Sequence, residues 1–158
     1  MNAFDISLAE NDLKQRISDL LLSPTGSRLA VWQGDTGSVL LHVETLQVRL
    51  LEGWMLVSLD LETDQTGQQT LQFIFCLGAA NNGDDLNATA TINAPTANAA
   101  VLADAWGSTL QRVLWDAVLD GVEAAVASVR AQAGTGTLLL TGFHSGAQQL
   151  VISIAAGL

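Results

Sequence analysis

The sequence predicts an α+β protein made of a short N-terminal helix, a curved antiparallel β-meander, a long amphipathic helix and a C-terminal β-hairpin. Three observations predict this class. Apolar residues recur at helical spacing close to the N-terminus, alternate with polar residues over much of residues 28–77, and return to helical spacing from about residue 96. The chain of 158 residues has the usual size of one domain, so we expect residues 1–158 to fold as a single domain.

An amphipathic helix is predicted over residues 8–22. Its apolar positions follow helical spacing and are separated by charged and amide side chains: Leu13, Ile17, Leu20 and Leu21. Ser7 and Glu10 have the spacing of a capping box, in which both side chains accept hydrogen bonds from free backbone N–H groups of the first turn. Pro24 and Gly26 then predict the end of the helix.

An antiparallel meander is predicted next. We expect strands at residues 28–33, 38–44, 46–62 and 70–77, with a turn at 34–37, a bend, bulge or tight turn at Glu52-Gly53, a polar loop at 79–87 and at best a short strand at 88–92. One face of the third strand segment is apolar and comprises Met55, Val57, Leu59 and Leu61. The acidic residues Asp60, Glu62 and Asp64 on its other face are typical of a solvated strand face.

A long helix is predicted over residues 96–132, because one apolar stripe keeps its phase along the whole segment. A continuous helix here would be about 55 Å long at roughly 1.5 Å per residue. That length leaves two alternatives open, namely two helices or one helix that extends beyond its own subunit. Small residues recur at every fourth position and permit close packing: Ala117, Gly121 and Ala125. We expect a curved sheet of about five to seven strands to pack on this helix.

A C-terminal hairpin is predicted from two strands, 137–143 and 148–156, joined by a turn at 144–146. Both faces of these strands are apolar: Leu138 and Leu140 against Leu139 and Phe143, and Leu150, Ile152 and Ile154 against Val151. Strands that are apolar on both faces are normally covered on both. We therefore expect the hairpin to lie centrally under the long helix or to meet another subunit.

Composition and charge exclude several classes of protein. A hydrophobic fraction of 49% with a charged fraction of 14% is the opposite of the balance found in disordered chains. Sixteen acidic and six basic residues give a net charge of −10, which repels nucleic-acid phosphates and anionic lipids and is compatible with a basic partner protein. The N-terminus lacks the pattern of a signal peptide, and no apolar run reaches the roughly 18–20 residues of a membrane span. We therefore expect a cytoplasmic protein that binds neither nucleic acid nor membrane.

The sequence carries no recognisable catalytic, metal or cofactor motif. The run Gly-Phe-His-Ser-Gly around Ser145 fails the G-x-S-x-G spacing of a nucleophile elbow, so we expect a hairpin turn there. Cys76, His42 and His144 could in principle form an activated thiolate or a zinc site, but no C-x-x-C or H-x-x-x-H spacing supports either. The oxygen-rich segment 81–87 lacks the EF-hand spacing of a calcium loop. We expect no metal, no cofactor and no enzyme activity.

Large apolar residues outside the clearest core set predict an interaction surface. That set comprises Leu29 and Val31 on the first strand and the alternating residues from Met55 to Leu61 on the third. Trp32 and Trp54 fall on the opposite faces of these strands, where Leu40 can join Trp32 and Leu56 joins Trp54. Together with the apolar terminal strand, the candidate interaction surface comprises Trp32, Trp54, Leu56, Leu150, Ile152 and Ile154. The N-terminal helix, a second subunit or a ligand could cover it.

These features predict a non-enzymatic protein-binding module (an adaptor, a chaperone-like or an immunity-like protein) that forms a homodimer. In size, charge and mixture of helices and strands the chain resembles the small acidic secretion chaperones of bacteria and the acidic immunity proteins that cover basic toxins. No motif carries this resemblance, and we assign no family. The rarity of lysine and the absence of tyrosine suggest a GC-rich bacterial genome. Two alternatives stay open: a module that binds a small apolar ligand or lipid in a pocket between the sheet and the long helix, and an enzyme that uses Cys76 or a histidine.

Overall fold

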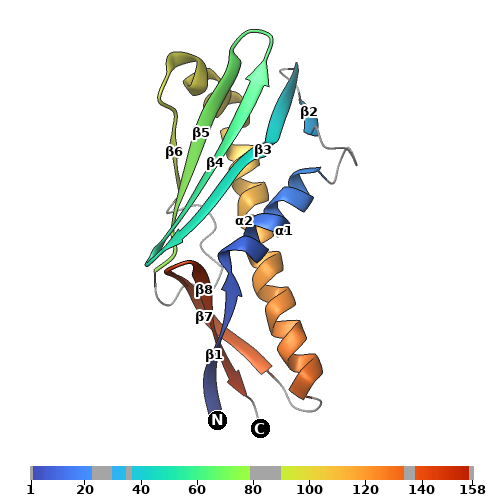
Figure 1. Ribbon diagram of the computed structural model, residues 1–158, viewed down its shortest axis with the longest axis vertical. Helices are drawn as coiled ribbons and strands as arrows, with labels where there is room; N and C mark the ends of the chain where they lie inside the picture. The colour runs from blue at the N-terminus through green and yellow to red at the C-terminus, as the bar shows by residue number, and fades with distance from the viewer. Residues whose placement is uncertain (1, 23–29, 35–36, 79–89, 134–137, 157–158) are drawn as a thin grey trace.

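The computed structural model describes residues 2–22, 30–34, 37–78, 90–133 and 138–156, and it has the predicted α+β class (Figure 1). The elements in chain order are β1 (Asn2–Ala9), α1 (Glu10–Leu22), β2 (Ala30–Gly34), β3 (Gly37–Leu51), β4 (Trp54–Thr63), β5 (Gly67–Cys76), β6 (Ala90–Asn93), α2 (Ala97–Ala133), β7 (Leu138–Gly146) and β8 (Gln149–Ala156). The expectations for Pro24 and Gly26, for residues 35–36 of the first turn and for the loop at 79–87 lie outside the described residues. None of the described helices is both long and apolar enough to span a membrane.

The meander forms a five-stranded antiparallel sheet in the order β2-β3-β4-β5-β6. Strands that follow one another in the chain are neighbours in the sheet, as short connections favour. β3 is one strand of 15 residues where we expected two segments, because a register shift between His42 and Gln47 lets the pairing with β4 continue past an irregularity. The chain then turns back at Glu52-Gly53, where Gly53 has a φ of 81°, a left-handed value that glycine adopts without a steric cost.

One face of this sheet belongs to the hydrophobic core. The buried residues of its central strands are each at most 1% exposed and alternate as predicted: Met55, Val57, Leu59, Leu61, Leu71, Phe73 and Phe75. α1 contacts β3, and α2 contacts β5 and β6, so both helices cover this face (Figure 1). Removing these side chains from water contributes about 25 cal/mol per Å² of apolar surface.

The C-terminal hairpin joins a second sheet, with the strand order β1-β8-β7, instead of the meander. β1 corrects our expectation for the N-terminus, because residues 2–9 form a strand that pairs with β8 and places Ile6 opposite Ile152. Ser7 therefore lies within a strand, and the predicted capping box does not form. α1 begins at Glu10 instead of residue 8.

A bulge in β7 decides which residues of the hairpin face the core. The pairing with β8 shifts between Leu140 and Gly142, so Leu140 and Phe143 share one face, the one that packs on α2. The opposite face carries Leu139, which is 49% exposed, and polar residues such as Ser153. Within the described chain the hairpin is therefore covered by α2 on one face, so it does not lie centrally between two layers, and the alternative that its other face meets another subunit stays a prediction.

α2 is one continuous helix of 37 residues, so the alternative of two helices is excluded. Thr96 caps its first turn, because its Oγ1 accepts a hydrogen bond from Ala99 N at 3.0 Å. α2 extends behind both sheets (Figure 1). β1 and α1 both pack against it at Gly121, where an added Cβ would lie 2.9 Å from Leu8 Cδ2 of β1 and 3.3 Å from Arg16 Cδ of α1. The small residue therefore allows the close packing that the sequence predicts.

The two sheets meet where the end of β7 contacts the β3–β4 turn. Three backbone hydrogen bonds form a closed ring: Gly53 N donates to Ser145 O at 2.8 Å, Ser145 N to Leu77 O at 2.9 Å, and Leu77 N to Gly53 O at 2.8 Å. Beside this ring, Gln148 N donates to Leu50 O at 2.9 Å. These bonds pair backbone groups at the ends of strands that would otherwise be buried without partners.

Side chains reinforce the same junction. The Ser145 side chain is fully buried, and its Oγ lies 2.6 Å from Leu51 O and 2.8 Å from Trp54 O, both of which can accept its proton. Glu10 Oε2 accepts a hydrogen bond from Leu50 N at 2.7 Å. The start of α1, the β3–β4 turn and the end of β7 are therefore held together by polar contacts.

We predict that Ser145→Ala lowers the free energy of unfolding by about 1–3 kcal/mol, because it removes a fully buried hydroxyl that donates to the carbonyl groups of the β3–β4 turn. Urea denaturation followed by circular dichroism measures this loss. The control is Ser153→Ala, which removes a hydroxyl that bonds Asp5 on an exposed face and should change stability by less than about 0.5 kcal/mol. Equal losses in the two variants would contradict a special role for the junction.

Candidate functional site

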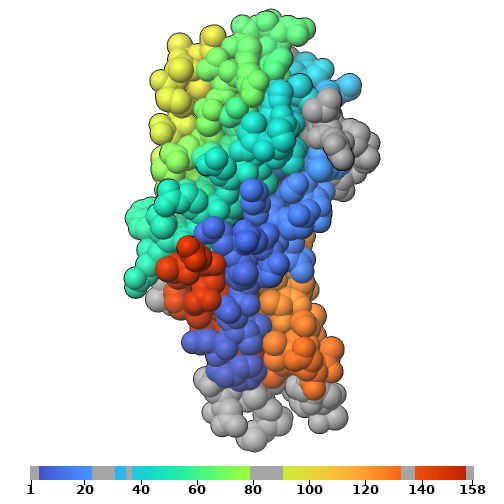
Figure 2. Space-filling model, in the orientation of Figure 1, coloured from blue at the N-terminus to red at the C-terminus, as the bar shows by residue number. Residues whose placement is uncertain are grey.

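The outer face of the five-stranded sheet, opposite the core face, carries large apolar side chains at one end. Leu51 and Trp54 are paired across β3 and β4 at the turn, and they are 39% and 47% exposed. Cys76 of β5 lies opposite Trp54, while Leu56 and Ile74 are paired in the next row and partly buried. We call these residues the outer patch: Leu51, Trp54, Leu56, Ile74 and Cys76. Within the described chain no helix covers this face, which Figure 2 shows from the front with β3, β4 and β5 in cyan to green.

The other end of the same face is acidic. His42 is 14% exposed at its side chain and lies between two carboxylates, with Nδ1 2.9 Å from Glu44 Oε1 and Nε2 2.9 Å from Glu62 Oε1. Asp60, opposite His42 in the ladder, accepts hydrogen bonds from Thr70 Oγ1 at 2.6 Å and from a Gln68 side chain at 2.9 Å. We call the carboxylates around His42 the acidic cluster: Glu44, Asp60 and Glu62.

The acidic cluster favours the charged form of His42. Burial lowers the pKa of His42, but the hydrogen bonds and charges of Glu44 and Glu62 outweigh that effect, and the pKa is raised above its ordinary value of 6.5. A backbone hydrogen bond and the hydrogen bond from His42 together lower the pKa of Glu44 from its ordinary value of 4.5. One imidazolium faces three carboxylates, so the cluster keeps a net negative charge.

The outer patch and the acidic cluster lie on one continuous surface. Leu56 and Asp60 are four residues apart on β4, which corresponds to about 13 Å along a strand. Uncharged polar residues such as Ser58 and Gln72 fill the interval between them. A segment complementary to this arrangement would present apolar groups at one end and basic groups at the other.

The structure separates the two tryptophans of the predicted surface. Trp54 lies on the outer face, opposite to the core set, as its strand position predicts. Trp32 lies on the core side instead, paired with the buried Val39, and its Nε1 donates to Leu21 O at 3.3 Å. The outward position on β2 belongs to Val31, which is 45% exposed. Residues 28–29, which set the predicted phase of this strand, lie outside the described residues.

Leu56 lies beside Trp54 in the outer patch, as predicted, whereas the three predicted members on β8 are in the core. Leu150, Ile152 and Ile154 are fully buried on the face of β8 that packs toward α2. They are not accessible to a partner in this conformation.

The side chains that were candidates for catalysis or metal binding lie far apart or already form hydrogen bonds within the fold. Cys76 lies opposite Trp54 and His42 lies opposite Asp60, six residues further along β4, which separates them by about 20 Å. Ser145 holds the sheet junction. Among the described residues no group of three His, Cys, Asp or Glu side chains is arranged to hold a metal ion.

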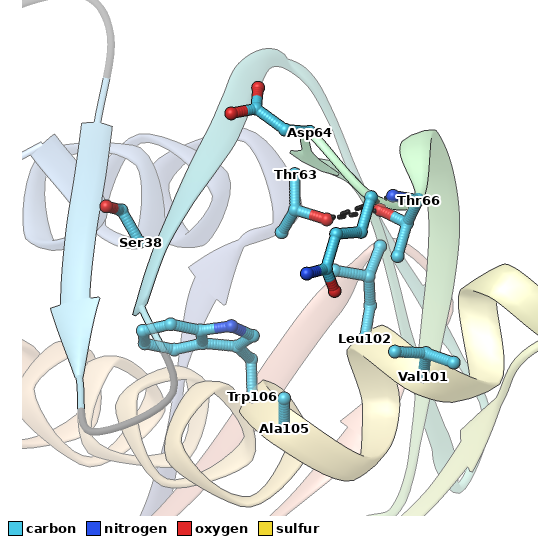
Figure 3. Close-up of a pocket in the computed structure, with 9 residues that line it drawn as sticks. Ser38, Thr63, Asp64, Thr66, Val101, Leu102, Ala105 and Trp106 are labelled. Carbon is cyan, nitrogen blue, oxygen red and sulfur yellow. Dashed lines mark hydrogen bonds between the residues drawn. The ribbon is translucent and has the colours of Figure 1, made fainter.

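A pocket of about 410 Å³ opens between the far end of the sheet and α2 (Figure 3). Its lining combines the β4–β5 turn, the start of β3 and one face of α2: Ser38, Thr63, Asp64, Gln65, Thr66, Val101, Leu102, Ala105 and Trp106. The hydroxyls of Thr63 and Thr66 lie 2.8 Å apart, and the Trp106 indole packs on Gly34, where an added Cβ would be 3.1 Å from Trp106 Cη2. The volume falls in the range of small-molecule sites. Sequence patterns alone do not predict this pocket, because Trp106 has the helical spacing of the other residues in the apolar stripe of α2.

Comparisons of the chain with protein-family models, curated proteins and solved structures gave no match.

We predict that His42→Gln destabilises the protein most between about pH 5 and pH 6.5 and much less near pH 8.5. The raised pKa of His42 contributes stability that is complete below its ordinary pKa and is lost as the pH rises through the raised value. The lowered pKa of Glu44 contributes stability that is present above its ordinary pKa and is lost at lower pH. The difference should be at most about 1 kcal/mol, because both carboxylates are exposed to water. Urea midpoints of both proteins at the two pH values test this, and a pH-independent difference would contradict it.

Proposed function

We propose that the protein is a non-enzymatic protein-binding module that uses the outer face of its five-stranded sheet. One observation carries the proposal: Trp54 is 47% exposed beside Leu51 on a sheet face that no described helix covers. Tryptophan is over-represented among the residues that dominate binding energy in protein interfaces. Contiguous apolar residues rimmed by polar ones are typical of interaction sites on soluble proteins.

The charge of the outer face supports a basic partner. The acidic cluster lies on the same face as the outer patch, beyond the row of Ser58 and Gln72, and the whole chain has a net charge of −10. Opposite charge accelerates association and rejects acidic competitors more than it adds affinity. Burial of Trp54 and its neighbours would then supply most of the binding free energy.

The proposal also covers location and assembly. We place the protein in the cytoplasm, since its one cysteine leaves the fold independent of disulfides. We further propose that it self-associates, as an adaptor or chaperone-like protein that holds a partner would.

We predict that an amphipathic peptide of Leu and Lys binds the protein and that Trp54→Ser weakens this binding about tenfold or more, the loss typical of an interface aromatic. Isothermal titration calorimetry measures both affinities. Val31→Ser is the matched control, because Val31 is 45% exposed on the same sheet but outside the outer patch, and it should leave the affinity within about twofold.

A second peptide, in which Glu replaces every Lys, separates the apolar from the electrostatic contribution. It should bind far more weakly than the Lys peptide, and the Lys peptide should lose affinity as salt screens the acidic cluster. Binding that is equal for both peptides, or unaffected by Trp54→Ser, would refute the proposed site.

A second candidate function, binding of a small ligand, is favoured by the pocket beside Trp106. One wall is apolar and belongs to α2, while the other offers the Thr63 hydroxyl and the Gln65 amide. The Asp64 carboxylate points away from Trp106 (Figure 3). This lining suits a compact molecule with one apolar side and one side that forms hydrogen bonds.

We predict that protein purified gently from its own host carries a small-molecule adduct in native mass spectrometry, and that Ala105→Phe abolishes it by filling the pocket. Leu139→Ser, at an exposed site on β7, serves as the control and should keep the adduct. A wild-type protein without any adduct, or an adduct that survives Ala105→Phe, would argue against this second function.

A further inference from the structure

A second apolar groove lies between the C-terminal half of α2 and β7, in the other half of the molecule from the Trp106 pocket. It has a volume of about 330 Å³ and is lined by Leu119, Val122, Glu123, Val126, Ala127, Arg130 and Leu140. Leu140 forms its strand wall and is 41% exposed. The groove is distinct from the outer patch, which lies on the five-stranded sheet.

The strand beside the groove is poorly protected. β7 is an edge of the three-stranded sheet among the described residues, and it contains no charged residue. Exposed edge strands normally carry charges or proline that prevent contact with other chains. Leu139 and Leu140 are instead 49% and 41% exposed. The bulge between Leu140 and Gly142 interrupts regular backbone pairing, so a contact here would be made mainly by side chains.

The charges that line the groove are complementary to those of the same groove on a second copy of the protein. Glu123 and Arg130 both line it and are seven residues apart on α2, which is about two helical turns. The midpoint between them falls between Val126 and Ala127. If a second α2 lies antiparallel across this midpoint, Glu123 of each copy faces Arg130 of the other. Arg130 donates one hydrogen bond, from Nη2 to Leu138 O at 3.1 Å, and its guanidinium has further donors for a carboxylate.

We propose that two copies of the protein associate through this groove, with antiparallel α2 helices and a two-fold axis beside Val126 and Ala127. A basic segment in the groove would meet Arg130, and an acidic segment would meet Glu123. A second copy satisfies both residues with the same contact, as a two-fold interface requires. The inference rests on the proposed self-association and is independent of the outer patch.

The test is sedimentation equilibrium of the full chain and of charge-reversed variants at physiological salt. The wild type should be a dimer. Glu123→Arg places two arginines against each other at both ends of the interface, and Arg130→Glu does the same with carboxylates, so each should weaken the dimer about tenfold or more. The double variant restores both pairs and should dimerise like the wild type. An equimolar mixture of the two single variants should form a heterodimer, because each supplies what the other lacks.

These combinations distinguish the interface from a structural role. The double variant still lacks the bond from Arg130 to Leu138, so loss of a fold-stabilising contact would not be rescued. A monomeric wild type, single variants that remain dimers, or a double variant and a mixture that both stay monomeric would each overturn the proposal.

A cross-linking experiment locates the axis. In a Cys76→Ala background, Ala127→Cys should form a disulfide-linked dimer under mild oxidation, because symmetry brings this position close to its own copy. Ala105→Cys, at another exposed alanine of α2, should not. Equal cross-linking of both variants would refute the axis.

Titration of the Leu/Lys peptide into the charge-reversed variants shows whether the outer patch is intact. The loss of the dimer and the loss of the partner site can therefore be measured independently of each other.

Discussion

The ring of hydrogen bonds among Gly53, Leu77 and Ser145 is the contact on which the rest of the structure depends. The two sheets share no strand pairing within the described chain, and this ring joins them directly. The ring fixes the position of one sheet relative to the other, because its backbone groups cannot shift without moving whole strands. The Ser145 hydroxyl adds a second constraint, because it binds carbonyl groups of the β3–β4 turn from the end of β7. The Ser145 hydroxyl is thus buried and engaged in joining the two sheets.

The junction also determines how the outer patch is presented. The carbonyl of Trp54 accepts the Ser145 proton, while the Trp54 side chain is 47% exposed. The backbone of the turn is therefore fixed, and its aromatic ring is offered to solvent from a rigid support. Rigid presentation lowers the conformational entropy lost on binding. α2 contacts both sheets. It therefore connects the groove beside Arg130, next to the three-stranded sheet, to the five-stranded sheet that carries the outer patch.

Part of the candidate site follows from strand alternation. The period of two in β4 places Trp54 and Leu56 opposite the buried set, and the structure agrees. The same reasoning fails for Trp32, whose phase depends on where β2 begins, and for β7, where one bulged residue inverts every side chain that follows. The sequence analysis predicts no strand before the helix, although Phe4, Ile6 and Leu8 alternate with other residues, and the helix predicted from residue 8 includes the last two residues of β1. The contact of His42 with Glu62 joins two strands, and no local pattern shows it.

The sequence by itself determined the strands of the meander, the terminal hairpin and the long helix, because periodicity and turn residues act within a few positions of one another. It also determined the charge and the absence of a recognisable catalytic motif. Only the tertiary structure decided that the terminal hairpin pairs with the N-terminus, that Ser145 joins the two sheets, and that Leu150, Ile152 and Ile154 are buried while Trp54 is not. These outcomes depend on pairing between strands more than a hundred residues apart, such as β1 with β8. Such pairing is selected by which faces can be buried together, and residue types alone do not encode it.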